Sequence, residues 1–183
     1  MSATSLSRHI EFLCELDRLK LVLRQTLLHD GSRRENTAEH SWHLATSVLV
    51  LSEHANIPTL DVLKAVKMAL LHDIVEIDAG DTFVYDAAAH ADKAEREQAA
   101  IRRLCSLLPS PLGPEFEAIW QEFEERVSPE ALFVAAVDRF LPILANHRTQ
   151  GHSWKKHSIR EPQVLALNSR MKEGSAALWD YTR

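Results

Sequence analysis

A histidine and an aspartate stand side by side at the end of an apolar run in the middle of the chain, at His72 and Asp73. Such helix positions normally face the core, so two ionisable groups there carry a large desolvation cost unless a partner compensates them. Imidazole nitrogen and carboxylate oxygen are ligands of borderline divalent ions such as Mn, Fe, Co, Ni or Zn. The pair is therefore a candidate metal site, and a structural hydrogen bond between buried side chains is the alternative that the pair alone leaves open.

Two further residues favour the metal interpretation. His40 lies in the first turn of a predicted helix, where a capping or half-buried histidine is the alternative. Asp138 is embedded in an apolar helical stretch at 135–140, where a carboxylate needs a cation, and the adjacent Arg139 points in another direction. Two histidines and two aspartates from three helices would form an N2O2 ligand set that leaves room for water and a substrate oxygen.

An acidic residue follows the His-Asp pair at one helical turn. Glu76 is four residues after His72 and three after Asp73, which places it on the same side of a continuous helix. Gly80 is expected to end that helix.

Helical periodicity dominates the remaining sequence and predicts an all-α protein of about seven helices in one domain, residues 1–183. No stretch shows the alternation of a strand, residues 81–89 and 149–158 are expected to be loops, and Pro142 is expected to kink its helix. The expected helices are those at 12–23, 38–49, 63–78, about 90–108, 116–127, from 129 through 138, and from 162 onward.

Composition excludes several classes of protein. The net charge is −5, which argues against a protein whose main role is to bind nucleic acid. The sequence contains no run of about 20 apolar residues, so no membrane-spanning helix is expected. The two cysteines, Cys14 and Cys105, are expected to be free thiols in a reducing compartment, and no secretory signal is visible. We therefore expect a cytoplasmic protein.

The order His40, His72-Asp73, Asp138 resembles the pattern of the HD-domain metal-dependent phosphohydrolases. Finer matches point to the branch that contains the 5′-deoxynucleotidases, and the resemblance covers about residues 10–170. The matching segments are Leu19-Lys20 with Arg24, Glu35-Asn-Thr-Ala-Glu-His40-Ser, His72-Asp73 with Glu76, Gly80-Asp81, and Asp138-Arg-Phe.

The resemblance implies an HD-type helical bundle with one divalent ion, whether Mn, Co, Fe, Ni, Zn or Mg, held by His40, His72, Asp73 and Asp138. It also implies that Glu76 and Asp81 flank the substrate and the attacking water, and that Arg24 contacts the phosphate. Lys20, one turn before Arg24, would add to a phosphate site or to a solvated helix face. A homodimer is a further expectation by analogy with the family.

Two features depart from the family pattern. Gln25 stands where an aromatic residue is expected directly after the phosphate-binding arginine, which puts the preference for deoxyribose in doubt. The loop at 81–89 lacks the expected proline, and its Phe83 and Tyr85 could contact a base or cover the core.

Several histidines remain without an assigned role. His43 could bind a second ion, support the first site or simply pack, and we favour the last two readings. The segment 146–157 resembles a stretch found after the last aspartate in close relatives, and Trp154 is expected to anchor it.

These observations predict a phosphohydrolase that acts on a small phosphomonoester, most simply a nucleoside 5′-monophosphate with ribose or deoxyribose. One alternative is a phosphodiesterase or pyrophosphohydrolase acting on a signalling nucleotide. The other is a helical binding protein that holds a metal without turnover, which the presence of Glu76 and Asp81 argues against.

Overall fold

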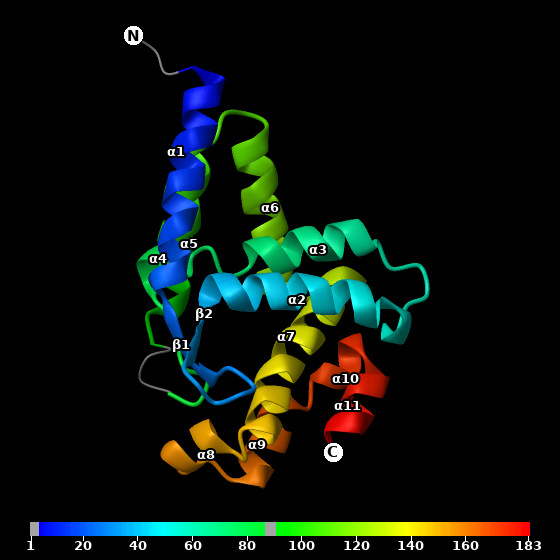
Figure 1. Ribbon diagram of the computed structural model, residues 1–183. Helices are drawn as coiled ribbons and strands as arrows, with labels where there is room; N and C mark the ends of the chain where they lie inside the picture. The colour runs from blue at the N-terminus through cyan, green and yellow to red at the C-terminus, as the bar shows by residue number, and fades with distance from the viewer. Residues whose placement is uncertain (1–3, 87–90) are drawn as a thin grey trace.

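The computed structural model describes residues 4–86 and 91–183, and this part of the chain is mostly helical (Figure 1). The predicted all-α class is confirmed. The α-helices are α1 (Ser5–Asp17), α2 (Thr37–Leu51), α3 (Val62–Leu71), α4 (Glu76–Ala79), α5 (Lys93–Leu107), α6 (Leu112–Glu125), α7 (Pro129–Arg148), α8 (His152–Lys156), α9 (Glu161–Asn168), α10 (Met171–Gly174) and α11 (Ala176–Thr182).

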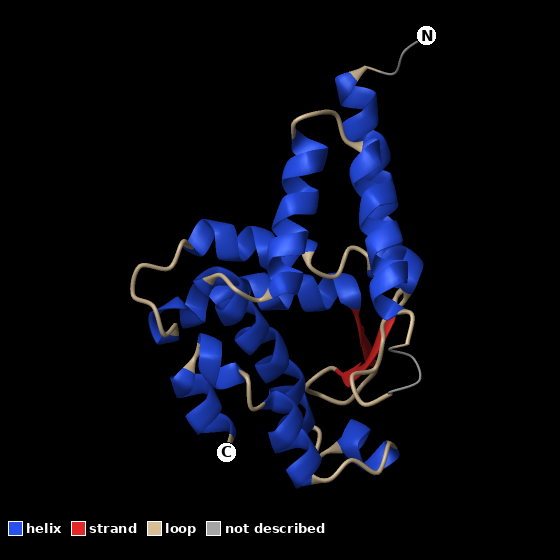
Figure 2. Ribbon diagram, turned by 180° about the vertical axis from the view of Figure 1, so that it is seen from behind, coloured by secondary structure: helices blue, strands red, loops and turns tan. Residues whose placement is uncertain are grey.

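One small sheet interrupts the helices. Strands β1 (Leu23–Leu27) and β2 (Arg34–Asn36) form an antiparallel hairpin, which Figure 2 shows in red. The expectation of no strands was therefore wrong at this place. The apolar spacing from 12 to 23 looks helical throughout, but α1 ends at Asp17 and a 3₁₀ turn, Arg18–Leu21, leads into β1. A second 3₁₀ turn, Ser52–His54, follows α2.

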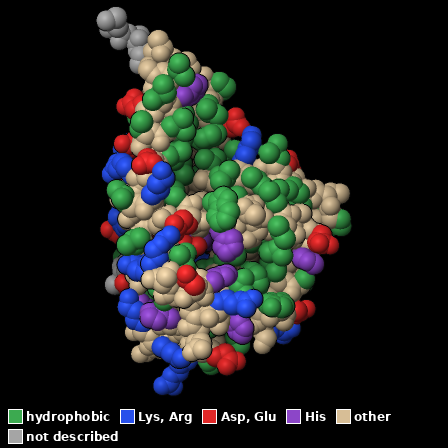
Figure 3. All heavy atoms as spheres, viewed as in Figure 1, with side chains coloured by type: hydrophobic (Ala, Val, Ile, Leu, Met, Phe, Trp, Pro, Cys, Tyr) green, Lys and Arg blue, Asp and Glu red, His purple; other side chains and the backbone are tan. Residues whose placement is uncertain are grey.

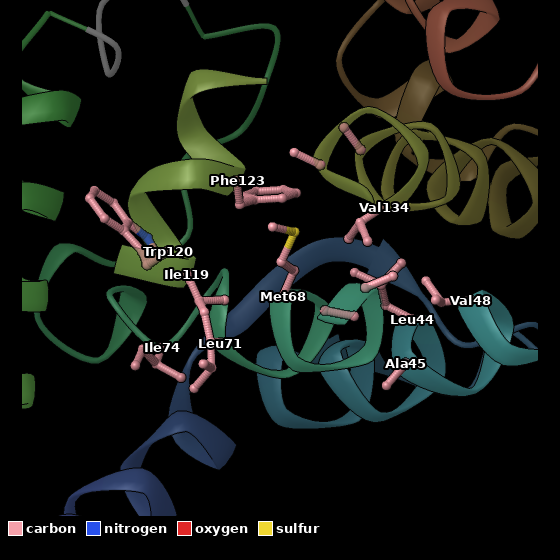
Figure 4. Close-up of a cluster of buried hydrophobic side chains, with 14 of the residues drawn as sticks. Leu44, Ala45, Val48, Met68, Leu71, Ile74, Ile119, Trp120, Phe123 and Val134 are labelled. Atoms are coloured by element: carbon pink, nitrogen blue, oxygen red, sulfur yellow. The ribbon is translucent and has the colours of Figure 1, made fainter. Parts of the chain in front are cut away.

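The core lies where α2, α3, α6 and α7 meet. Met68 of α3 points between Leu44 of α2, Phe123 of α6 and Val134 of α7, and all four side chains are buried (Figure 4). The helices α1 and α5 stand against one another beside this centre, α8 lies near the end of α7, and α10 packs against the first turns of α7 (Figure 1). None of the described helices is long and apolar enough to cross a membrane.

The predicted third helix does not continue to residue 78. α3 ends at Leu71, and the chain then winds more tightly: the N–H of Ile74 donates to the carbonyl of Leu71 and that of Glu76 to the carbonyl of Asp73, each three residues back. The His72–Asp73 pair therefore lies in a tightened turn between α3 and α4. This turn departs from regular α-helical spacing at the pair itself.

The helices α2 and α7 begin at residues that cap them. The side chain of Asn36 accepts from the N–H of Glu39, and the Glu39 carboxylate accepts from the N–H of Asn36, which completes a capping box. Ser128 caps α7, whose first residue is Pro129. That helix continues through Pro142 to residue 148.

The predicted loops were less accurate. Residues 81–86 are non-helical as expected, whereas 87–89, and residue 90 at the expected start of the next helix, lie outside the described residues. The expected loop at 149–158 contains the short helix α8, and the expected last helix is divided into α9, α10 and α11.

Exposed apolar side chains gather on one face of the molecule. Figure 3 shows hydrophobic side chains over α1 and over the pair α2 and α3. The exposed large hydrophobic side chains of these helices include Leu6, Ile10 and Leu13 of α1, Trp42 and Leu49 of α2, and Leu63 and Leu70 of α3.

Gly174 allows α10 to approach α7 closely, because a Cβ at this position would overlap the carbonyl of Leu132. We predict that Gly174→Ala lowers the free energy of unfolding by about 1–3 kcal/mol through overpacking against backbone that cannot yield. Urea denaturation measures the change. Lys172→Ala, an exposed position of the same helix, is the control and should be close to neutral; equal stability of the two variants would contradict the prediction.

Candidate metal centre and active site

The four predicted metal-ligand side chains lie close together beside the helical core. The Nε2 atom of His40 lies 3.0 Å from Oδ1 of Asp138 and 3.9 Å from Oδ2 of Asp73. The Nε2 atom of His72 lies 2.9 Å from Asp73 Oδ2 and 3.8 Å from Asp138 Oδ1. His40, His72 and Asp73 each offer a ligand atom within 4.8 Å of the other two. Asp138 adjoins both histidines, so the set could hold one ion.

Each ligand residue is placed by a different element. The capping box fixes the start of α2, and His40 follows it by one residue with its side chain fully buried. The tightened turn after α3 lets His72 and Asp73, which are adjacent in sequence, face the same point. On α7, Asp138 follows the buried Val137 and lies on the side that borders the cavity.

The protonation pattern of His72 fits a metal ligand. Its Nδ1 lies 3.0 Å from the backbone carbonyl of Ala69, and a carbonyl can only accept, so Nδ1 carries the proton and Nε2 of the neutral ring carries a lone pair. Nε2 is buried and makes no hydrogen bond to any residue that the structure describes. A buried lone pair without a donor beside two carboxylates is satisfied by a cation.

Glu35 supports His40 from the other side of the imidazole ring. Its Oε2 lies 3.6 Å from Nδ1 of His40, and the buried Nδ1 has no hydrogen-bond partner in the described part of the chain. A carboxylate behind a ligating histidine holds the ring orientation and strengthens the ligand. This position of Glu35 could not be predicted from the sequence, because the residue lies in β2, where helical spacing says nothing about its neighbours.

Arg24 brings a positive charge to the carboxylates. Its Nη1 lies 3.0 Å from Asp73 Oδ2 and 3.8 Å from Asp81 Oδ1, and its Nε lies 3.6 Å from Glu35 Oε2. Burial opposes the charge, yet the surrounding carboxylates, Asp73 first, raise the pKa of Arg24 overall. The guanidinium therefore stays charged at the cavity, where it is paired with Asp73.

Two carboxyl groups of the site hold their protons more strongly than usual. Burial, reinforced by the charge of Asp73, raises the pKa of Glu76 well above its ordinary value, while Thr37 donates a hydrogen bond of 2.7 Å to Glu76 Oε2. Burial also raises the pKa of Asp81, although Arg24 works in the opposite direction. Groups with raised pKa values that face a cavity are suited to proton transfer.

The ligand carboxylates are shifted the other way. Burial alone would raise the pKa of Asp73 and of Asp138, but their histidine neighbours lower both. The same pairing, working against burial, raises the pKa of His40 and of His72. Protons and a metal ion therefore compete for the two imidazoles, and ion binding is favoured at higher pH.

A cavity of about 360 Å³ opens onto this cluster, within the size range of small-molecule sites. Its lining includes Arg24, Asp73, Glu76, Asp81 and Asp138. The structure thus places seven of the eight predicted site residues at or directly beside one cavity, with His72 in the lining and His40 behind Asp73 and Asp138.

Lys20 is the predicted site residue that the structure does not bring to the cavity. Its side chain is 64% exposed and pairs with Asp17, three residues earlier. The change from helix to 3₁₀ turn and strand after residue 17 separates Lys20 from Arg24, whereas the helical interpretation placed them on one face.

His43 does not extend the metal cluster. Its ring packs against His29, with centroids 5.9 Å apart, and burial lowers its pKa. Among residues 4–86 and 91–183, the ligand group that contains His40, His72 and Asp73 is the one metal-competent group found. The geometry therefore fits a packed or supporting role of His43 better than the binding of a second ion.

The segment 146–157 forms a wall of the cavity. Buried Asn146 accepts hydrogen bonds from the N–H and the hydroxyl of Ser153, at 3.2 and 2.7 Å, and so ties the segment to the end of α7. Trp154 and Gln25 both line the cavity. Gln25 Oε1 lies 3.4 Å from Nε2 of His157, whose ring is 4.5 Å from that of Phe83, so a polar and aromatic wall occupies this side.

Comparisons with known proteins agree with this geometry. A family model described as HD domain matches residues 16–179. The chain is similar to "5′-deoxynucleotidase HDDC2" of Bos taurus, with 32% identity over 79% of this chain and 69% of that protein, and to the Dictyostelium discoideum protein of the same name, with 30% identity over 90% and 86%.

Solved structures show the same fold. A predicted metal-dependent phosphohydrolase from Magnetospirillum magnetotacticum superposes with a TM-score of 0.92 at 47% identity, over 98% of this chain and 89% of that one. A conserved hypothetical protein from Pyrococcus furiosus, at 23% identity and a TM-score of 0.64 over 90% and 95% of the two chains, shares the fold.

We predict that His72→Ala retains less than about a tenth of the metal bound by the unaltered protein, because one ligand and its lone pair are lost. Elemental analysis of purified protein measures the ion content per chain. His43→Ala is the matched control and should keep its metal. Stoichiometric metal in folded His72→Ala, checked by circular dichroism, would show that the ion lies elsewhere.

Proposed function

This chain belongs to the HD-domain family of metal-dependent phosphohydrolases, and we propose that it hydrolyses nucleoside 5′-monophosphates, with ribose or deoxyribose, to a nucleoside and phosphate. The observation that carries the proposal is the convergence of an N2O2 ligand set, a buried arginine and two carboxyl groups of raised pKa on one cavity. The names of the similar proteins support the substrate class.

His40, His72, Asp73 and Asp138 hold the divalent ion in this proposal. Mixed nitrogen and oxygen ligands suit Mn, Co, Fe, Ni or Zn, and Mg is also compatible with the carboxylates. When bound, the ion lowers the pKa of a water molecule and offsets the charge of the phosphate.

Arg24 binds the phosphate of the substrate. Its guanidinium faces the cavity beside Asp73 and keeps its charge in the buried site. A phosphate monoester and its transition state are anionic, and planar guanidinium binds phosphate oxygens through paired hydrogen bonds. Arg24 therefore orients the phosphorus atom toward the attacking water.

Glu76 and Asp81 move the protons. Glu76, held by Thr37, accepts a proton from the water as its oxygen bonds to phosphorus. The ester P–O bond breaks, and Asp81, whose pKa is raised by burial, donates a proton to the leaving oxygen. Water and ester are thus converted to an alcohol and phosphate with all atoms accounted for.

The exposed apolar face of α1, α2 and α3 supports a homodimer. Trp42 is 67% exposed and Leu63 68%, and apolar patches of this kind mark interaction surfaces. A twofold axis lets such a face meet its own copy. We predict a light-scattering mass of twice the 20.7 kDa chain, reduced to one chain in Leu49→Glu. A wild-type mass of one chain would reject the dimer.

The substrate proposal predicts release of inorganic phosphate from nucleoside 5′-monophosphates when Mn or Co is supplied. A colorimetric phosphate assay over ribo- and deoxyribonucleotides measures it, and removal of the ion with a chelator should abolish it. Metal-loaded protein that releases no phosphate from any monophosphate would overturn the substrate class.

Glu76→Gln should lower kcat by at least about 100-fold while metal content holds, because the general base is lost. In the unaltered protein, activity should rise with pH through the raised pKa of Glu76, since only the ionised carboxylate accepts a proton. The exposed Glu95→Gln is the control and should keep full activity.

A further inference from the structure

In the described part of the chain, two arginines of the cavity form no ion pair with a carboxylate. Arg126 and Arg139 both line the space that opens onto the metal site. Within residues 4–86 and 91–183, neither forms an ion pair at 4.0 Å or less. The other cationic side chains of the lining are paired: Arg24 with Asp73 at 3.0 Å, Lys93 with Glu97 at 2.7 Å, and Arg170 with Glu173 at 2.9 Å.

The guanidinium of Arg126 is held in place but not neutralised. Its Nε donates to the carbonyl of Phe123 at 3.2 Å, and its Cζ lies 4.5 Å from the centre of the Phe123 ring. The backbone of Arg126 is left-handed, with φ of 54°, a conformation that residues other than Gly and Asn rarely adopt. The terminal nitrogens make no hydrogen bond to the described residues and remain available.

The charge around Arg126 favours an anion. Burial lowers the pKa of Arg126, and Arg139 and Arg170 lower it further, while Asp138 and Glu124 offset part of the decrease. Two neighbouring positive groups that repel each other in a half-buried site gain from a shared anionic ligand.

The spacing relates Arg126 to the metal site, and Arg139 lines the same cavity. The Phe123 ring that carries Arg126 also packs on the His72 ring, with centroids 5.2 Å apart. The Arg126 guanidinium therefore lies within about 10 Å of the His72 ring. One sugar with two phosphate groups can span such a distance.

We propose that Arg126 and Arg139 form a second phosphate subsite, so that the preferred substrate carries two phosphates on one sugar. This inference rests on the proposed function, since the hydrolysed phosphate occupies the metal end of the cavity. Water attacks only that phosphate: its P–O ester bond breaks, the sugar oxygen takes a proton, and the phosphate between the arginines stays on the product. Arg126 and Arg139 position the substrate and take no part in proton transfer.

The test compares adenosine 3′,5′-bisphosphate with AMP. We expect kcat/KM at least about tenfold higher for the bisphosphate in the unaltered protein, and a ratio near one in Arg139→Gln and in Arg126→Gln, because a charge-assisted contact is lost. A second comparison measures the ratio of kcat/KM for fructose 1,6-bisphosphate to that for fructose 6-phosphate. A larger ratio for this pair than for the nucleotides shows that the substrate with two phosphates is a sugar without a base.

Arg102→Gln is the control, an exposed arginine of α5 outside the cavity, and should keep the ratio. Arg126 also caps α6, so thermal unfolding checks that Arg126→Gln is folded. If Arg126→Gln does not fold, the result for Arg139→Gln decides the test. A ratio near one in the unaltered protein, for nucleotides and sugars alike, overturns the subsite.

Calorimetry separates this inference from the proposed function. If no monophosphate is hydrolysed, but the bisphosphate binds at least about tenfold more tightly than AMP and loses this advantage in Arg139→Gln, the subsite stands and the monophosphatase proposal fails. Equal affinities would reject the subsite, whatever the activity on AMP.

Discussion

The structure depends on keeping several charges inside a helical core. Asp73, Asp138 and Arg24 are largely withdrawn from solvent, and two buried imidazoles lie between the carboxylates. Burial of unpaired charges is costly, so each group must be compensated by its neighbours. The side chains of the site compensate one another only in part. The carboxylates outnumber the buried guanidinium of Arg24, and the lone pair on Nε2 of His72 faces them without a hydrogen-bond donor among the described residues. A divalent ion completes the balance.

The apolar packing around this cluster determines its geometry. Met68, Phe123 and Val134 close the space between α3, α6 and α7 (Figure 4), which fixes where the chain leaves α3 and where α7 presents Asp138. The ring of Phe123 contacts both His72 and Arg126. One core side chain thus links the His72 end of the cavity to Arg126.

The polar support of the site comes from short, irregular segments. Glu35 and Thr37 lie at the end of β2 and the start of α2, and they contact His40 and Glu76 respectively. Gln25 and the segment 146–157 build the far wall. Loops and element ends can vary without disturbing the core, so we expect this wall to influence substrate preference.

The sequence by itself determined the helical class, the capping box at Asn36, the start of α7, and the metal candidates, because these depend on local residue type, on spacing and on the improbability of buried unpaired charge. It placed Lys20 beside Arg24, and missed the hairpin and the tightened turn at His72. Only the tertiary structure decided those points, along with the role of Glu35 and the pairing state of each arginine. The reason is physical: strand pairing, desolvation and ion pairing join residues distant in the chain, and their energies depend on three-dimensional neighbours that periodicity does not encode.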